Sequence, residues 1–208
     1  MDIESFCKEL EAKGKDLDKL AKRSLPVKVG AIARRHYQDN FRQGGFVNNG
    51  LKPWQRSKRQ SSKSKDAAYG TLLSRERNLF KGLTYITGDY RAKVYNNLPY
   101  APIHNWGGIV HPQVTPKMRR FAWAKYFQST GTPPKRINGL VAGKNGKKRT
   151  MPGARMNEEA NMWKRLALTK KKRLNVTIPQ RQFLGESKEL DTKIQSKIET
   201  EILIVLNK

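Results

Sequence analysis

The sequence predicts an α+β fold, in which a small antiparallel sheet packs with an N-terminal helical region and a C-terminal helix. Apolar residues recur at helical spacing near both ends of the chain, and two alternating segments flank Gly88 and Asp89 in its middle. A long basic stretch, residues 111–173, separates the middle of the chain from its end. We therefore expect residues 1–110 and 174–208 to form one domain that carries residues 111–173 as a large basic insertion.

The N-terminal region is expected to form two helices. An apolar stripe predicts the first helix over residues 3–24, and Pro26 is expected to end or kink it because proline lacks a backbone donor. The second helix is expected over residues 27–43, with His36 as a partly buried residue rather than a metal ligand. Gly44 can adopt the positive φ of a helix C-cap. The stripe of the first helix consists of Ile3, Phe6, Cys7, Leu10, Leu17, Leu20 and Ala21.

The middle of the chain is expected to contain a loop, a short helix and a hairpin. Residues 47–70 are polar and basic and predict a loop that Trp54 anchors on the fold. Residues 70–83 predict a short helix that runs into the first strand. Residues 83–87 and 90–95 alternate between β-branched or aromatic and other side chains, which predicts the two strands of a hairpin.

The last part of the chain is expected to return to the domain through the insertion. The insertion should hold helices over residues 116–128 and 157–173, joined by a loop rich in Gly, Pro and Lys. Residues 174–178 predict a strand, and apolar residues at helical spacing predict a final helix from about residue 188. The aromatic residues of the first insertion helix are expected to pack on the domain, and stacking on nucleic-acid bases is the alternative. These aromatic residues are Phe121, Trp123, Tyr126 and Phe127.

The positive charge of the chain is large and unevenly distributed. The sequence has 43 Lys and Arg against 17 Asp and Glu, a formal net charge of +26. Residues 111–173 contain 17 Lys or Arg and two acidic residues, and residues 52–65 contain six Lys or Arg and no acidic residue. Such an excess attracts polyanions, and DNA would be contacted through its backbone rather than its bases. The alternative is a solvated basic loop. The candidate polyanion contacts are Lys117, Arg119, Arg120, Lys125, Lys147, Lys148, Arg149, Lys170, Lys171, Lys172 and Arg173.

Several classes of function find no support in the sequence. No apolar run approaches the ~20 residues needed to span a bilayer, and the N-terminus is not expected to be a secretory signal. Cys7 is the only cysteine, which excludes an internal disulfide and a cysteine zinc cluster. His104 and His111 lack a zinc-ligand spacing, and no phosphate-cradling or nucleophile motif is present. We expect no enzyme, cofactor or metal; an endonuclease that uses His104 and Asn105 is the weakest alternative.

A series of short motifs follows the predicted elements in a fixed order. The motif residues are Trp54, Tyr100, Ala101, His104, Gly107, Gly108, Pro179, Arg181, Phe183 and Gly185. Their order and spacing resemble the phage virion morphogenesis family, the Mu-type tail completion proteins, which are related to head–tail joining proteins. The resemblance covers roughly residues 30–110 and 174–205. Residues 74–79 replace a Ser-Gly turn of the family pattern, and the insertion is longer than the minimal family domain.

The resemblance implies a structural phage virion protein that acts in tail completion or head–tail joining. It further implies a homo-oligomeric ring, a hexamer or similar, at the tail end or neck. The partners would be other neck and tail proteins, with packaged DNA as a further, non-specific candidate and no membrane. The protein would be in the virion, and in the host cytoplasm during assembly. The rival interpretation is a stand-alone basic nucleic-acid-binding protein.

The motif residues themselves are expected to support folding rather than catalysis. Tyr100, Ala101 and His104 should form a short turn that packs on the sheet. The glycine pair that follows should let the chain reverse close to a neighbouring segment. Arg181 should bind a carboxylate or backbone carbonyls and fix the turn before the last helix.

Overall fold

The computed structural model describes residues 2–61, 65–130 and 158–207. The chain divides into two compact units. We call Met1–Gly108 with Ile178–Lys208 the main unit and Ile109–Thr177 the insertion unit. The described part of the chain is mostly helical and has three small antiparallel sheets of two strands each, which confirms the predicted α+β class.

The N-terminal helical region is one helix that changes its hydrogen-bonding pattern before Pro26. A π-helical segment, η1, joins α1 directly to α2. The wider turn accommodates Pro26, which cannot donate the backbone hydrogen bond of a regular α-helix. Gly44, with φ of +71°, ends α2 as predicted, and its N–H donates to the carbonyl of Asn40. The three segments are α1 (Ile3–Lys19), η1 (Leu20–Ser24) and α2 (Leu25–Gln43).

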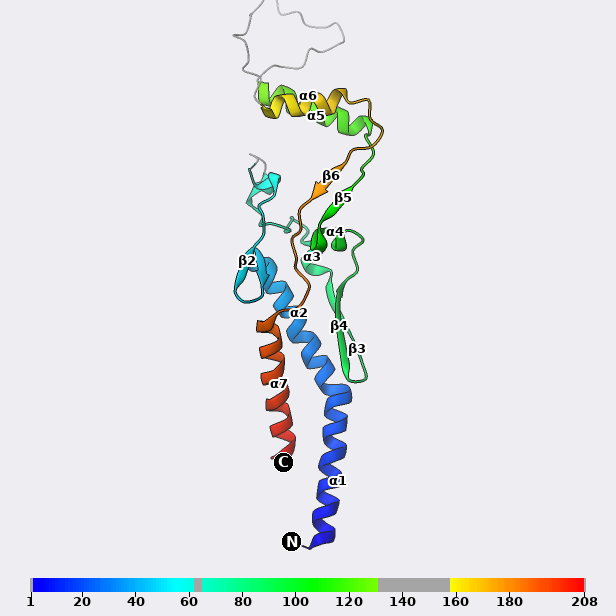
Figure 1. Ribbon diagram of the computed structural model, residues 1–208, viewed down its shortest axis with the longest axis vertical. Helices are drawn as coiled ribbons and strands as arrows, with labels where there is room; N and C mark the ends of the chain where they lie inside the picture. The colour runs from blue at the N-terminus through cyan, green and yellow to red at the C-terminus, as the bar shows by residue number, and fades with distance from the viewer. Residues whose placement is uncertain (1, 62–64, 131–157, 208) are drawn as a thin grey trace, which may run out of the picture. The chain divides into compact units, whose positions relative to one another are not determined.

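The main unit is built around α2 (Figure 1). The predicted hairpin of β3 (Leu83–Gly88) and β4 (Arg91–Asn96) packs along one side of this helix, and the C-terminal helix α7 (Lys188–Leu206) packs along another. Ser187 caps α7, because its hydroxyl accepts the N–H of Leu190 at 3.3 Å.

The hairpin turn lies one residue later than the sequence predicts. Asp89 and Tyr90 form the turn, and Tyr90 has a φ of +59°, so it does not belong to the strand. This conformation is unfavourable for an aromatic residue. Contacts with the long N-terminal helix compensate for it, because the Tyr90 hydroxyl donates to Asp18 and Asp89 forms an ion pair with Lys22 at 3.6 Å.

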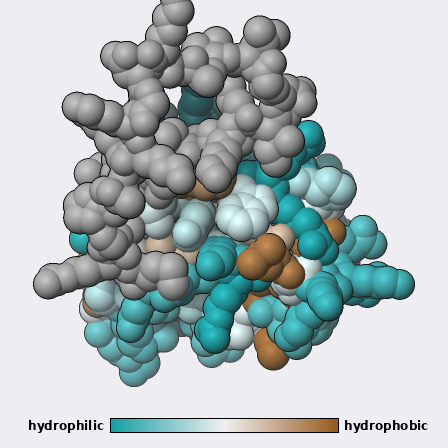
Figure 2. Space-filling model, turned by 90° about the horizontal axis from the view of Figure 1, so that it is seen from above, coloured by the Kyte–Doolittle hydropathy of each residue, from teal (hydrophilic) through white to brown (hydrophobic). Residues whose placement is uncertain are grey.

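The core of the main unit is small and centred on aromatic rings. The Phe41 ring lies 5.2 Å from that of Phe183, 5.4 Å from that of Trp54 and 6.2 Å from that of Phe80, measured between centroids. Leu83 and Phe183 are completely buried. Figure 2 shows one face of the molecule, on which hydrophilic residues predominate among those drawn in colour.

Two predictions for the middle of the chain need correction. Residues 51–53 are not part of a loop, because β1 (Gly45–Val47) and β2 (Leu51–Pro53) form a second small hairpin. Asn49 and Gly50 have positive φ values of 53° and 94°, which allow its tight turn. Residues from Ala101 onward do not form a turn but the short helix α4 (Ala101–Trp106), which has a proline in its first turn. The other short helices here are η2 (Lys58–Ser61), η3 (Lys65–Ala68) and α3 (Asn78–Lys81).

The insertion unit is a helical hairpin with a short β-ladder. The helices α5 (Pro116–Thr130) and α6 (Glu158–Leu168) run side by side in opposite directions (Figure 1). Small buried side chains, Ala122, Ala160 and Ala167, allow them to approach closely. The strands β5 (Gly108–Val110) and β6 (Val176–Ile178) pair with each other. The second helix and the late strand are thus shorter than predicted.

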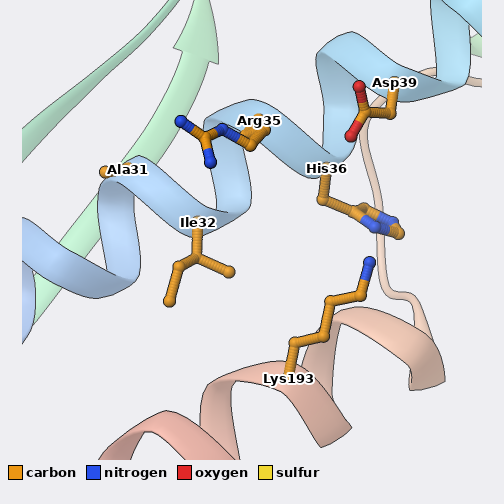
Figure 3. A pocket seen from close by; sticks show the side chains of 6 residues that line it. All are labelled: Ala31, Ile32, Arg35, His36, Asp39 and Lys193. Atoms are coloured by element: carbon orange, nitrogen blue, oxygen red, sulfur yellow. The ribbon is translucent and has the colours of Figure 1, made fainter.

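A pocket of about 220 Å³ lies where α2 and α7 face each other (Figure 3). His36 on α2 is 5% exposed, and its Nε2 atom has no hydrogen-bond partner among the described residues. Lys193 points from α7 toward it (Figure 3). Burial lowers the pKa of His36 and the charge of Lys193 lowers it further, against the opposing influence of Glu189 and Asp39. His36 is therefore neutral at neutral pH and acts as part of the helix interface.

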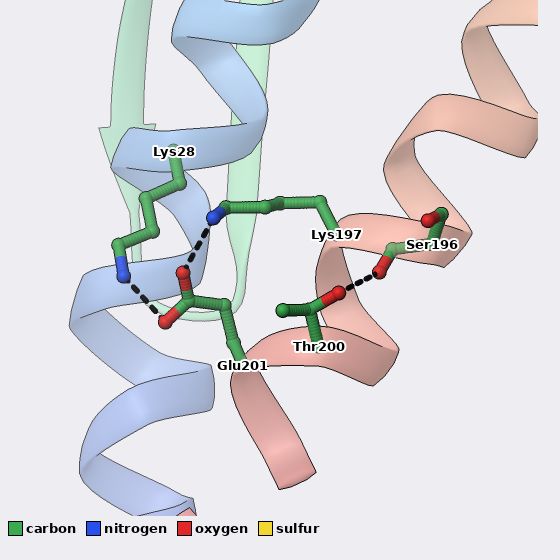
Figure 4. Close-up of polar contacts among 5 residues, drawn as sticks. All are labelled: Lys28, Ser196, Lys197, Thr200 and Glu201. Atoms are coloured by element: carbon green, nitrogen blue, oxygen red, sulfur yellow. Dashed lines mark hydrogen bonds and ion pairs between the residues drawn. The ribbon is translucent and has the colours of Figure 1, made fainter. Parts of the chain in front are cut away.

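A carboxylate between two ammonium groups also joins α2 to α7 (Figure 4). Glu201 is 7% exposed and accepts hydrogen bonds from Lys197 at 2.8 Å and from Lys28 of α2. These bonds, that of Lys197 first, hold the pKa of Glu201 below its ordinary value of 4.5. The carboxylate therefore stabilises the packing of the two helices when it is charged.

We predict that Glu201→Gln lowers the melting temperature at neutral pH, because two ammonium groups lose their counter-charge. The matched change Glu199→Gln, at an exposed position of α7, should leave it unchanged. Because the folded state lowers the pKa of Glu201, the stabilisation is present above the unfolded value and disappears as the pH falls through the folded value. Thermal unfolding across an acid pH series checks this. A wild-type advantage over Glu201→Gln that persists undiminished in acid would contradict it.

Candidate functional site

The late motif residues lie in a segment without regular structure, residues 179–187, which passes over α4. The side-chain amide of Asn105 forms hydrogen bonds with backbone N–H and C=O groups of this segment. Its Oδ1 accepts the N–H groups of Phe183 at 2.8 Å and Leu184 at 2.9 Å, and its Nδ2 donates to the Leu184 carbonyl at 3.1 Å. Asn105 is 4% exposed, so these bonds satisfy backbone groups that have little access to water. The amide thus takes the place of a neighbouring strand.

Three further contacts hold the same segment. The Trp54 indole N–H donates to the Gln182 carbonyl at 2.7 Å, and the Tyr37 hydroxyl donates to the Gly185 carbonyl at 2.8 Å. The backbone N–H of Arg181 donates to the carbonyl of His104 at 2.8 Å. Residues from α2, from the loop after β2 and from α4 therefore meet on one short stretch of backbone.

Two motif glycines are required by this close packing. Gly107 ends α4 with a φ of +73°, and a Cβ atom there would lie 2.9 Å from the backbone nitrogen of Gln180. Gly185 has a φ of +156°, and a Cβ atom there would collide with the side chain of Gln182. At Gly107 any other residue would force the two segments apart, because the atom it would meet is backbone. At Gly185 the positive φ is the constraint, since the end of the Gln182 side chain can move aside. Gly108 and Pro179 lie beside them, at the start of β5 and directly after β6.

The remaining motif residues line an open pocket of about 330 Å³ in the main unit. Tyr100 lies directly before α4, and its ring is perpendicular to that of His104, with centroids 6.1 Å apart. Arg181 is 9% exposed, and its Nε donates to the Gln55 carbonyl at 2.9 Å. Burial and then the charge of Arg181 lower the pKa of His104, and burial lowers the pKa of Arg181. Ala101 faces the core instead and is 3% exposed.

The described side chains of this region hold backbone groups and pack on the core. Among residues 2–61, 65–130 and 158–207, no group of three His, Cys, Asp or Glu could hold a metal ion. No described helix is long and apolar enough to cross a membrane. The region thus brings together Trp54, the motif residues of α4 and those of residues 179–185.

Two residues of this network, Asn105 and Tyr37, are not among the site residues predicted from the sequence. Asn105 stands between His104 and Trp106, and the sequence suggests it only as a partner of His104 in a nuclease. A polar amide near the end of a short helix, two residues before a pair of glycines, is a weak signal for backbone binding. Tyr37 carries no signal beyond its place on the buried face of α2.

The candidate polyanion contacts lie in the insertion unit. Arg119 and Lys125 are half-buried, and Lys125 donates to Gln128 at 3.0 Å. Lys147, Lys148 and Arg149 lie outside the described residues. All ion pairs within the described part of the chain belong to the main unit, so the described candidates carry uncompensated charge. Those that are exposed are Lys117, Arg120, Lys170, Lys171, Lys172 and Arg173.

The insertion aromatics contact one another and α6. The Trp123 and Phe127 rings stack with centroids 5.8 Å apart, and Phe121 meets Trp163 of α6 edge to face at 5.7 Å. These contacts bury part of the ring surface within the insertion unit. Phe121, at 53% exposed, is more accessible to an outside partner than Trp123, Tyr126 and Phe127.

We predict that Asn105→Ala lowers the free energy of unfolding by about 3 kcal/mol, because the buried N–H of Phe183 and the partly buried N–H of Leu184 lose their acceptor. Asn97→Ala, at an exposed position before α4, is the matched control and should change it by less than about 0.5 kcal/mol. Urea unfolding of both variants gives the comparison. Equal effects of the two substitutions would show that the Asn105 amide does not hold the segment.

The motifs that meet around α4 lie within a stretch that matches a known family. No curated protein and no solved structure matches the chain. A model of the phage virion morphogenesis family matches residues 2–202, which is nearly the whole chain and includes every motif residue described above. The resemblance predicted from the motifs is thus confirmed, and the chain belongs to the phage virion morphogenesis family.

Proposed function

We propose that this protein completes the phage tail or joins the head to the tail, as a homo-oligomeric ring at the tail end or neck. The match to the family over residues 2–202 carries the proposal, since it indicates a structural virion protein. The role needs no catalysis, and its neighbours would be other neck and tail proteins. The protein would reach the virion from the host cytoplasm, where assembly takes place.

The exposed apolar face of α1 supports association between copies. Ile3, Phe6 and Leu10 are 79%, 53% and 62% exposed, and none of the described residues of α1 is buried. The end of α7 lies beside this helix, because Lys13 donates to the Leu206 carbonyl at 2.8 Å. Leu203 is 56% exposed there. Apolar surface on two neighbouring helices gains free energy when another subunit covers it.

We predict that the purified protein is an oligomer and that Phe6→Glu with Leu10→Glu reduces its molar mass. Two carboxylates would have to be buried in the interface, which is costly. Ser5→Glu with Ala12→Glu adds the same charge to the other side of α1 and should leave the molar mass unchanged. Light scattering coupled to size-exclusion chromatography gives the masses. A wild-type monomer that also never enters assembled particles would refute the ring.

The charge of the insertion unit supports a polyanionic partner. Copies of the exposed Lys170–Arg173 cluster, defined as residues 170–173, would repel one another around a ring unless a polyanion neutralised them. DNA that passes through the head–tail channel and an acidic virion protein are both suitable. Contacts with DNA would be of the backbone type and depend strongly on salt.

We predict that replacing the four basic residues of the Lys170–Arg173 cluster by Gln weakens DNA binding. The slope of log K against log salt should fall by about 0.9 for each phosphate that the protein no longer neutralises. The control replaces three Lys and one Arg at exposed positions of the N-terminal helix, namely Lys8, Lys15, Lys19 and Arg23. DNA binding of the two variants and the wild type, measured over a salt series, gives the comparison. An equal weakening in both variants would mean that net charge alone, and not the insertion, attracts DNA.

The rival function is a stand-alone basic nucleic-acid-binding protein. A monomer that binds nucleic acid tightly and is absent from particles would favour it. Metal-dependent DNA cleavage that His104→Ala abolishes would favour the nuclease. The exposed apolar face of α1 favours the assembly protein, because apolar surface of this kind is typical of a site of association with another chain.

A further inference from the structure

The most unusual charged group in the main unit is the guanidinium of Arg181. It is 9% exposed, yet no carboxylate among the described residues pairs with it. Its Nε donates to the Gln55 carbonyl, and no other side-chain hydrogen bond joins Arg181 to the described residues. Its terminal nitrogens are not among the enclosed atoms that lack a partner, so they keep access to the pocket. Buried charges in proteins are ordinarily paired, and their donors are satisfied.

His104 lines the same pocket as Arg181 and carries an enclosed atom, Nδ1, without a hydrogen-bond partner among the described residues. Hydroxyl groups of Ser57, Ser74 and Tyr100 line the same pocket, and none of its described lining residues is acidic. Polar donors and positive charge therefore converge on one recess of the main unit.

We propose that this pocket binds a carboxylate group of a neighbouring protein chain. The planar guanidinium of Arg181 has two free nitrogens, which match the two oxygens of a carboxylate. Leu72, Leu73 and Leu79 also line the pocket and suit the methylene groups of a glutamate side chain or of a C-terminal residue. The proposal rests on the proposed function, which supplies neighbouring virion proteins as the source of the carboxylate.

The depth of the guanidinium distinguishes a carboxylate from DNA. Nine-tenths of Arg181 is covered by the protein, so only a small part of the residue is open to a ligand in the pocket. A single side chain or chain end can do so. The phosphates of a duplex lie on a rigid convex backbone and reach exposed basic groups instead, such as those of the Lys170–Arg173 cluster.

His104 reports on the occupation of the pocket. Its pKa is lowered by burial and by the charge of Arg181. The charged or titratable groups that share the pocket are Arg59, Tyr100 and Arg181. A carboxylate bound to Arg181 offsets the positive charge and accepts a hydrogen bond from a protonated imidazole, and both effects raise the pKa of His104.

The test is an NMR titration of the histidines of the full chain in sodium acetate and in sodium chloride of equal ionic strength. Acetate should raise the pKa of His104 by about one unit. Arg181→Gln should abolish the acetate effect, whereas Arg34→Gln, which removes an exposed arginine of α2, should retain it. The wild-type titration alone is decisive if the Arg181 variant does not fold.

Three results would overturn the proposal: no effect of acetate on His104 in the wild type, an equal effect in folded Arg181→Gln, or an equal or larger effect of inorganic phosphate. The last would assign the pocket to phosphate groups. The titration reports on the isolated chain, and light scattering reports on ring formation. A failed pocket and a failed ring are therefore distinguishable.

Discussion

The hydrogen bonds between the Asn105 amide and the backbone of Phe183 and Leu184 unite parts of the chain that lie far apart in the sequence. They place Phe183 in the aromatic core against Phe41 and set the position from which α7 begins. Without them, the segment that follows the insertion would have to find its place through apolar contact alone, which is not directional. The return of the chain from a long excursion thus depends on one buried amide, supported by Trp54 and Tyr37.

The two units treat charge in different ways. In the main unit, ammonium and carboxylate groups meet across elements, as Lys28 and Glu201 do between α2 and α7. In the described part of the insertion unit, no basic group has such a partner. A surface of this kind is soluble but repels its own copies. Within the main unit, Arg181 follows the pattern of the insertion rather than that of its neighbours, which makes it the exception among the buried charged side chains.

Local patterns predicted the regular elements well. The β3–β4 hairpin, the end of α2 at Gly44 and the C-terminal helix follow from alternation, glycine and apolar spacing, all of which act within a few residues. The β1–β2 hairpin was missed because its strands have three residues each, too few for alternation to be visible. The turn at Tyr90 was displaced because contacts with Asp18 and Lys22, remote in sequence, stabilise its positive φ. The Asn105 network could not be predicted, since its partners are 78 and 79 residues away.

The π-helical segment η1 has a consequence for the long N-terminal helix. In an uninterrupted α-helix, each residue advances about 100° around the axis, so Leu10 and Leu17 of α1 would lie almost opposite the side of α2 that carries Ala33 and Tyr37. A π-helical turn holds one residue more than an α-helical turn, and this rotates the apolar stripe of α1 by about 100° toward that side. The π-turn thus changes the rotation of α1 about the helix axis relative to α2, and this brings the apolar residues of the two helices closer to the same side. Loss of one residue there would leave both helices intact and turn the apolar stripe of α1 away from the side of α2 that carries Ala33 and Tyr37.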